Sequence, residues 1–353
     1  MRNLFLLVAC LVVGIATAQK KPSYPDGLYA EVNTTKGLIV LQLEFERTPM
    51  TVANFVGLAE GTIDNTVLPP GKPYYDGSLW HRVVPGHVIQ CGMPANSKEP
   101  GPGYEYPNEI NPLLNHGRAG MVGIANGGPH TNGSQWYITL ADRSYLDGDY
   151  TVFGHVIKGL EVLPTITQED IIKTVRIVRV GKSAEGFRPT TTSFKAMVEA
   201  QKVSVKEAEQ KRRTEEEAFI QQSWPQAQSF MRYSILQNGE GARPKIGDRM
   251  TIRYSAQIPG GDKFVSTADG GKPWYGESAS AFEFVVGTTT ITAGFDAGVA
   301  QMRKGEKRVL IVPSEQAYGA GGYYPPDRKG EKRFHVSPFK TIIYEVEVLD
   351  ISR

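Results

Sequence analysis

The chain has 353 residues, and its 39 lysines and arginines nearly balance its 37 aspartates and glutamates, which leaves a formal net charge of +2. This length exceeds what one compact core usually needs and predicts two domains. The small net charge excludes a global field that would favour nucleic acid or an anionic membrane, so no nucleic-acid partner is expected.

The N-terminus has the pattern of a signal peptide. One positive charge in "MRN" precedes the apolar run "LFLLVACLVVGI", and "ATAQ" has the small-x-small form that predicts cleavage after Ala18. We therefore expect residues 1–18 to be removed and the protein to be exported, either periplasmic or secreted. An alternative takes "LVAC" as a lipoprotein box with Cys10 lipidated, but the apolar stretch before Cys10 is very short. No segment is long and apolar enough to predict a membrane span.

Residues 27–182 predict a domain rich in strands. The stretch "LIVLQLEF" alternates as a strand does, and "TPMTVANFVGLAEG" predicts a helix that Thr48 caps, Pro49 starts and Gly61 ends. The apolar stripe of this helix consists of Val52, Phe55, Val56 and Ala59. A strand-rich body covered by an amphipathic helix indicates a β-barrel.

Residues 183–230 are charged and helix-prone, and they predict a solvated helical linker without the apolar heptads of a coiled coil. We expect Phe219, Ile220 and Trp224 to dock the end of this helix on the domain that follows. Residues 231–353 return to alternating strands, "MTIRYSAQI" and "KTIIYEVEVLDI", around a short helix within "TAGFDAGVAQMRKGEK". A single helix across an antiparallel sheet predicts an α+β domain.

Most kinds of catalytic site have no support in the sequence. A phosphate loop, a zinc-spaced Cys/His cluster and a GxSxG elbow are all missing, so we expect neither a metal nor a cofactor. Apart from Cys10 the only cysteine is Cys91, which excludes a disulfide framework and is interpreted as a small buried apolar side chain. Two segments remain conspicuous: "LWHRVVPGHVIQCGMP" with Arg82 among apolar residues, and the turn-rich "GIANGGPHTNGSQWYITL".

These two segments, with "YLDGDYTVFGHV", resemble the cyclophilins, a family of peptidyl-prolyl isomerases, over about residues 28–181. The resemblance implies an eight-stranded antiparallel barrel closed by two helices, and it implies that Arg82, Gln90 and Asn126 are the catalytic residues. It further implies that Ala125 meets the substrate backbone together with Asn126, and that Gln135 supports the arginine. The proline pocket implied in this way is lined by Val88, Tyr137 and Leu146.

The sequence departs from the cyclophilin pattern at three substrate-binding positions. His87 stands where a phenylalanine usually closes the pocket, Tyr145 at the tryptophan position that governs cyclosporin binding, and Tyr150 where many members have histidine. We therefore expect cyclosporin-like ligands to bind only weakly. An unperturbed histidine titrates near pH ~6.5, so His87 is expected to make the activity sensitive to mild acid.

The C-terminal half resembles the FKBPs, a second isomerase family, through "VVGTTTITAGFDAGVAQMRKGEKRVLIVPSEQAYGAGG" and "TIIYEVEVLDI". The resemblance implies an aromatic pocket, where macrolide ligands would bind weakly; the matching residues are Tyr254, Phe264, Phe282, Ile291, Phe295, Tyr318 and Tyr344. Val265 stands where the family usually has an aspartate, and an insertion at about 267–281 and a long loop after Tyr318 follow.

We interpret the chain as an isomerase that rotates X-Pro bonds in unfolded or proline-containing polypeptides, mainly through its cyclophilin half. Because slow proline steps limit folding, it would assist the folding of exported proteins. The alternative is a binding module, a chaperone or scaffold that holds proline-containing segments without accelerating their rotation. Arg82 favours the enzyme, whereas Val265 favours the binding module for the second half.

Overall fold

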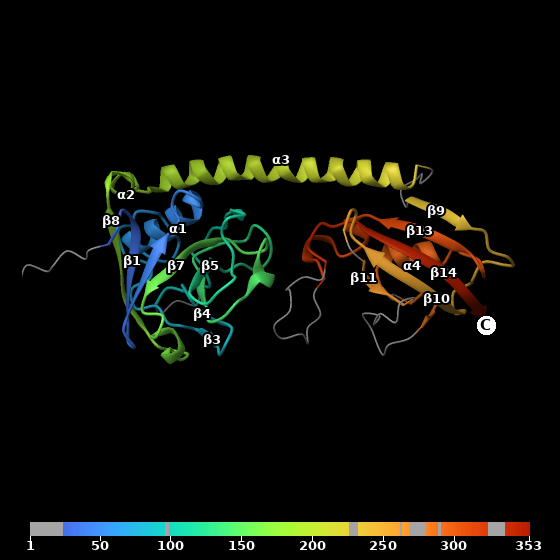
Figure 1. Ribbon diagram of the computed structural model, residues 1–353, viewed down its shortest axis with the longest axis horizontal. Helices are drawn as coiled ribbons and strands as arrows, with labels where there is room; N and C mark the ends of the chain where they lie inside the picture. Colours follow the sequence, from blue (N-terminus) through green and yellow to red (C-terminus); the bar gives the residue numbers. More distant parts are fainter. Residues whose placement is uncertain are drawn as a thin grey trace, which may run out of the picture.

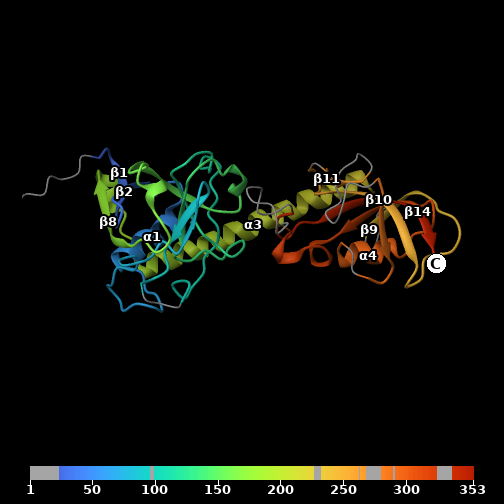
Figure 2. The same cartoon turned by 90° about the horizontal axis from the view of Figure 1, so that it is seen from below.

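The computed structural model describes residues 24–95, 99–225, 232–261, 263–267, 280–288, 291–323 and 336–353. The predicted signal peptide lies outside these residues, as do most of the predicted insertion at 267–281 and much of the loop after Tyr318. The described chain forms two β-rich domains, and the long helix α3 (Thr191–Ser223) runs along both of them (Figures 1 and 2). The predicted architecture, a barrel and an α+β domain joined by a helix, is confirmed.

The first domain is an eight-stranded antiparallel sheet with the strand order β3-β4-β6-β5-β7-β2-β1-β8. Its strands are β1 (Gly27–Thr34), β2 (Leu38–Leu43), β3 (Arg82–Val84), β4 (Val88–Cys91), β5 (Met121–Ile124), β6 (Trp136–Thr139), β7 (Val152–Lys158) and β8 (Ile172–Val180). An isolated bridge between Leu79 and Ile171 joins the segments that precede the two edge strands. This bridge brings the two edges of the sheet together, as in a partly closed barrel.

Helix α1 (Pro49–Glu60) crosses this sheet, and its predicted boundaries are confirmed, with Pro49 in its first turn and Gly61 in a left-handed conformation at its end. Thr48 occupies the predicted N-cap position, but its side chain makes no cap hydrogen bond. The carboxylate of Glu109 instead accepts hydrogen bonds from the backbone nitrogens of Met50 and Thr51, at 3.0 and 2.8 Å. A carboxylate here satisfies two amides that the helix itself leaves unpaired.

Helix α1 is buried all round rather than along one stripe, since every residue from Met50 to Ala59 is buried. Helix α3 also packs on this domain, because its Phe194 and Val198 belong to the core of the first domain. Helix α3 starts with a capping box, in which Thr190 and Ser193 each accept from the backbone of the other. The second helix over the barrel therefore comes from the segment predicted as linker, after the short α2 (Lys182–Gly186).

The second domain is a six-stranded antiparallel sheet ordered β11-β10-β14-β13-β9, with β12 also paired to β10. Its elements are β9 (Arg232–Gln237), β10 (Arg249–Gln257), β11 (Lys263–Ser266), β12 (Phe282–Val285), α4 (Ala293–Val299), β13 (Lys307–Val312) and β14 (Ile342–Ser352). Helix α4 packs against one face of this sheet through the fully buried Phe295 and Val299.

The end of α3 packs against the second domain, as predicted. Ile220 is buried with Val309, Ile311 and Ile343 in a separate apolar cluster, and Phe219 and Trp224 pack against it. At the other end of the helix, Gln201 donates a hydrogen bond to the backbone oxygen of Asn108 in the first domain, at 2.8 Å. Helix α3 therefore contacts both domains.

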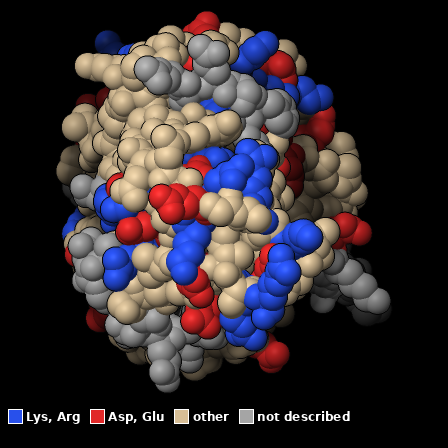
Figure 3. Space-filling model, turned by 90° about the vertical axis from the view of Figure 1, so that its right-hand side faces the viewer, with Lys and Arg blue, Asp and Glu red and all other residues tan. Residues whose placement is uncertain are grey.

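Charged side chains of both signs are interspersed on the face of the second domain that Figure 3 shows. Lys304 pairs with Asp350 at 2.7 Å, and Arg253 with Glu347 at 3.9 Å. In the part of the chain that the structure describes, no helix is both long and apolar enough to cross a membrane.

Candidate active site

Arg82 lies at the start of a row of residues that crosses four strands of the first domain. Arg82 on β3 pairs with Gln90 on β4, Gln90 pairs with Tyr137 on β6, and Tyr137 pairs with Gly123 on β5. Directly opposed residues in antiparallel strands share one face of the sheet. The row therefore brings a cation, an amide and an aromatic ring to the same face.

A chain of hydrogen bonds holds the Arg82 guanidinium. Its Nη1 donates to Oε1 of Gln90 at 3.3 Å, and Nε2 of Gln90 donates to Oε1 of Gln135 at 2.9 Å. Gln135 in turn donates to the backbone oxygen of Pro100 at 2.7 Å. The hydrogen bonds fix the guanidinium, and Arg82 nevertheless remains exposed to solvent.

The residues of the implied proline pocket form an apolar cluster beside this chain of hydrogen bonds. Val88, Tyr137 and Leu146 form a buried cluster of their own, and Ala125, Tyr145 and Tyr150 pack against it. The rings of Tyr137 and Tyr150 meet edge to face, with centroids 5.9 Å apart. The structure thus brings together, beside Gln90, the residues that the resemblance assigned to a proline pocket.

Asn126 lies next to the pocket in the turn-rich segment. Its Nδ2 donates to the backbone oxygen of Asp149 at 3.1 Å and to Oδ1 of Asn132 at 3.3 Å. A groove of about 780 Å³ runs past it, lined by Gln90, Ala125, Asn126, Gln135 and residues 99–105 among others. The groove therefore reaches Gln90, the residue whose side chain accepts from Arg82.

His87 lies at the rim of the pocket, and the expectation that it titrates near 6.5 is wrong. Its Nδ1 is 3.1 Å from the hydroxyl of Tyr145, and the two rings stack at 6.2 Å. Burial, and then the positive charges of Arg82 and Arg143, lower the pKa of His87 to about 4. The imidazole is therefore neutral at neutral pH and behaves as a flat ring.

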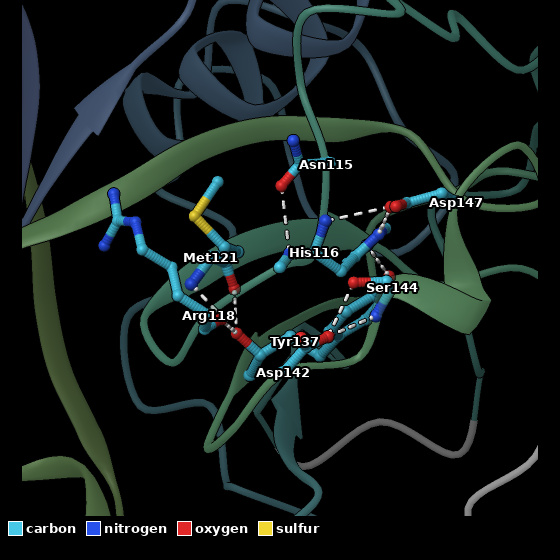
Figure 4. Close-up of polar contacts among 10 residues, drawn as sticks. Asn115, His116, Arg118, Met121, Tyr137, Asp142, Ser144 and Asp147 are labelled. Carbon is cyan, nitrogen blue, oxygen red and sulfur yellow. Dashed lines mark hydrogen bonds and ion pairs between the residues drawn. The ribbon is translucent and has the colours of Figure 1, made fainter.

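Sequence reasoning missed two residues behind the pocket, His116 and Asp147 (Figure 4). Nδ1 of His116 is 2.6 Å from Oδ1 of Asp147, and its Nε2 is 2.8 Å from the hydroxyl of Tyr137. The His116 side chain is fully buried. The only local signal was that Asp147 follows Leu146, and nothing in the sequence links either residue to His116.

The aromatic residues predicted for the second domain also lie in one cluster, on the core side of its sheet. Phe295 is 4.9 Å from Tyr344 and 5.5 Å from Tyr254, which is 5.8 Å from Phe282, measured between ring centroids. Ile291, Phe264 and Tyr318 join the same apolar cluster. A further aromatic that the sequence did not indicate, Tyr323, lies 5.1 Å from Tyr318.

Val265 is buried in this same cluster, opposite Ala256 on β10. The position at which the FKBP pattern has a carboxylate therefore presents only methyl groups. Within the described ranges, no three His, Cys, Asp or Glu side chains gather as a metal site would require.

Two family models match the chain. Cyclophilin type peptidyl-prolyl cis-trans isomerase matches residues 29–182, and FKBP-type peptidyl-prolyl cis-trans isomerase matches residues 240–349. Among curated proteins, peptidyl-prolyl cis-trans isomerase A of Mycobacterium tuberculosis is 42% identical over 132 residues, which cover 36% of this chain and 72% of that protein. A probable peptidyl-prolyl cis-trans isomerase A of Mycobacterium leprae is 41% identical over 165 residues, 46% of this chain and 85% of the relative.

Among solved structures, a cyclophilin type isomerase of Cryptosporidium parvum is 27% identical to this chain. The alignment covers 43% of this chain and 98% of that one, with a TM-score of 0.38. A second structure of that protein, determined in the presence of the dipeptide Ala-Pro, is 28% identical with a TM-score of 0.37 and covers 44% and 99% of the two chains.

Proposed function

The chain belongs to the cyclophilin type peptidyl-prolyl cis-trans isomerases through residues 29–182 and carries an FKBP-type isomerase domain at residues 240–349, and from this premise we propose how its two halves divide the reaction. The cyclophilin half performs most of the catalysis, with Arg82 as the catalytic residue. The FKBP half mainly holds proline-containing segments. The substrates are unfolded polypeptides outside the cytoplasm.

Rotation about an X-Pro bond breaks the amide resonance, a barrier of about 18–20 kcal/mol, and takes tens to hundreds of seconds without a catalyst. In the twisted transition state the imide nitrogen becomes pyramidal and gains a lone pair. A guanidinium directed at that nitrogen donates a hydrogen bond that the planar ground state cannot accept. Such an interaction lowers the barrier because it is present only in the transition state.

The observation that carries this proposal is the hydrogen-bond chain from Arg82 through Gln90 to Gln135, beside the apolar cluster of Val88, Tyr137 and Leu146. The chain fixes the planar donor in advance, and an arginine keeps its charge throughout the accessible pH range. The cluster holds the proline ring and excludes water. Ala125 and Asn126 are proposed to contact the substrate backbone along the groove.

The aromatic cluster that we propose as the pocket of the FKBP half is apolar. Phe295, Tyr254 and Phe282 supply the aromatic surface, and Val265 replaces the acidic group that would orient polar atoms. A dry aromatic pocket still binds proline rings, but an incompletely oriented site lowers the rate more than the affinity. This favours binding as the main role of residues 240–349, and it keeps weak macrolide binding as a prediction.

Export rests on the sequence of residues 1–18 alone. A cleavage after Ala18 would place the mature protein in the periplasm or outside the cell, where newly translocated chains need proline isomerisation. N-terminal sequencing of the mature protein tests this proposal. A mature chain that begins near residue 19 supports it, whereas an intact Met1 contradicts it and a lipid-modified Cys10 supports the lipoprotein alternative.

The division of labour is tested in the full chain with one variant in each half. Arg82→Ala disables the first site. Phe282→Ala removes one aromatic ring from the second pocket, and it should leave the fold intact because Phe282 is only partly buried. On a short Ala-Pro peptide, Arg82→Ala should lose most of the isomerase rate and Phe282→Ala little of it. Binding of an unfolded proline-rich protein should show the reverse. If Phe282→Ala lowers the peptide rate as much as Arg82→Ala does, the proposed division is wrong.

A further inference from the structure

Behind the proline pocket, a carboxylate, an imidazole and a phenol lie in series. Oδ1 of Asp147 is 2.6 Å from Nδ1 of His116, and Nε2 of His116 is 2.8 Å from the hydroxyl of Tyr137 (Figure 4). We propose that His116 and Asp147 are positioning residues for the isomerase reaction, which fix the wall of the proline pocket through the hydroxyl of Tyr137. This inference rests on the proposed site, in which Tyr137 contacts the proline ring.

The direction of the hydrogen bonds follows from the acceptors. Oδ1 of Asp147 also accepts from the backbone nitrogen of His116 at 2.8 Å, so the carboxylate is an acceptor for both donors of one residue. Nδ1 of His116 therefore carries the proton, and its Nε2 is the acceptor for the Tyr137 hydroxyl. Burial lowers the pKa of His116, although Asp147 opposes this effect, and the low pKa is consistent with a neutral ring.

Gly123 and His116 hold the hydroxyl of Tyr137 and so fix the position of its ring. Its hydroxyl lies so close to Gly123 that a Cβ atom on that residue would be 2.4 Å from the oxygen. The phenol thus crosses the backbone of β5 to reach His116, while its ring faces Val88 and Leu146. Turning the ring out of the pocket would break the bond to His116 and leave a buried acceptor without a donor, which is unfavourable.

The same histidine also contacts the residues on both sides of a turn that contributes to the pocket. The backbone oxygen of His116 accepts from the backbone nitrogen of Arg143 at 2.8 Å, and Asp147 directly follows the single-turn helix η1 (Ser144–Leu146). This turn carries Tyr145 and Leu146. His116 therefore connects β6 to η1, two elements that contribute side chains to the pocket from different directions.

The test is a double-mutant cycle in the full-length protein, with the rate of Arg82→Ala subtracted as the contribution of the FKBP half. His116→Phe keeps a flat ring but removes both nitrogens, and Tyr137→Phe removes only the hydroxyl. We expect His116→Phe to lower kcat/KM for an Ala-Pro peptide roughly tenfold, mostly in kcat, because misplaced groups cost rate before binding. In the Tyr137→Phe background the same change should lower it less than about twofold.

Asp147 gives a second arm that does not depend on the folding of the histidine variants. Asp147→Asn retains Oδ1 and should keep most of the rate, whereas Asp147→Ala should lose it. Glu161→Ala is the matched control: Glu161 is an exposed carboxylate of the first domain that lies outside η1 and its flanking residues. It should leave kcat/KM within about twofold, as expected for a change that removes no pocket contact.

The outcomes separate the inference from the proposed site. Equal losses from His116→Phe in both backgrounds would mean a general structural role and overturn the inference. Full activity of both His116→Phe and Asp147→Ala would also overturn it, provided that Arg82→Ala is inactive. If Arg82→Ala itself keeps the normal rate, the proposed site is wrong, and the inference falls with it.

Discussion

The neutral His87 leads to a prediction opposite to the one that the sequence suggests. A free histidine gains a proton near pH ~6.5, but burial and the charges of Arg82 and Arg143 lower the pKa of His87 to about 4 in the folded protein. Between these two values the unfolded chain binds a proton that the folded chain does not. Stability should therefore be complete above pH ~6.5 and decrease as the pH falls toward 4.

The size of this effect follows from the change in pKa. A decrease from 6.5 to about 4 corresponds to roughly 3.4 kcal/mol at ~1.36 kcal/mol per pH unit. Because the imidazole still meets solvent, we discount this to about 1.5 kcal/mol. Between pH 7 and pH 4, the free energy of unfolding of the first domain should thus fall by about that amount more in the wild type than in His87→Phe. The isomerase rate should stay flat from pH 8 to pH 5 in both proteins.

Nuclear magnetic resonance gives the direct measurement. The ring protons of His87, identified by their loss in His87→Phe, should titrate with a midpoint near 4. The parallel measurement is the isomerase rate of both proteins over the same pH range. A wild-type inflection near pH 6.5 that His87→Phe lacks would refute the reasoning, because it would mean that the folded protein does not lower the pKa.

Three further predictions concern other parts of the chain. Val265→Asp, measured in the Arg82→Ala background, should raise the residual isomerase rate severalfold while peptide affinity changes little; an unchanged rate would show that the missing carboxylate is not what limits this half. Glu109→Ala leaves two buried amides of α1 unpaired and should destabilise the first domain by about 2–4 kcal/mol in thermal unfolding. Thr48→Ala should cost less, and equal losses would contradict the capping found here. Tyr145→Trp should strengthen cyclosporin binding in calorimetry, and no gain would remove Tyr145 as the cause of the weak binding expected.

The sequence was sufficient for those parts of the proposed site whose residues are close together in the chain. Arg82 and Gln90 are eight positions apart on adjacent strands, and a motif of that length carries both of them. The apolar cluster proposed as the proline pocket could be predicted for the same reason, since Val88, Tyr137 and Leu146 each lie within a recognisable segment. The unusual residues His87 and Val265 could also be identified directly from the sequence. The burial and the neighbouring charges that lower the pKa of His87 could not.

What the sequence could not supply are contacts between distant segments. Glu109 caps a helix that starts sixty positions earlier in the chain, and the local rule selected Thr48 instead because it sees only neighbouring residues. His116 and Asp147 are 31 positions apart, and each is unremarkable in its own segment. The low pKa of His87 has the same origin, because Arg143 approaches it only in the folded chain.

The central claim, that Arg82 acts on the transition state rather than on the bound peptide, is tested by measuring rate and affinity on the same variant. Arg82→Ala removes one preorganised donor, which typically costs about 2.7–4 kcal/mol, or roughly a hundredfold or more in rate. We predict this loss in kcat/KM when Arg82→Ala and its parent both carry Phe282→Ala, which reduces the contribution of the FKBP half, with the dissociation constant for an Ala-Pro peptide changing less than about threefold. A normal rate in Arg82→Ala, or a loss of affinity as large as the loss of rate, would contradict the claim.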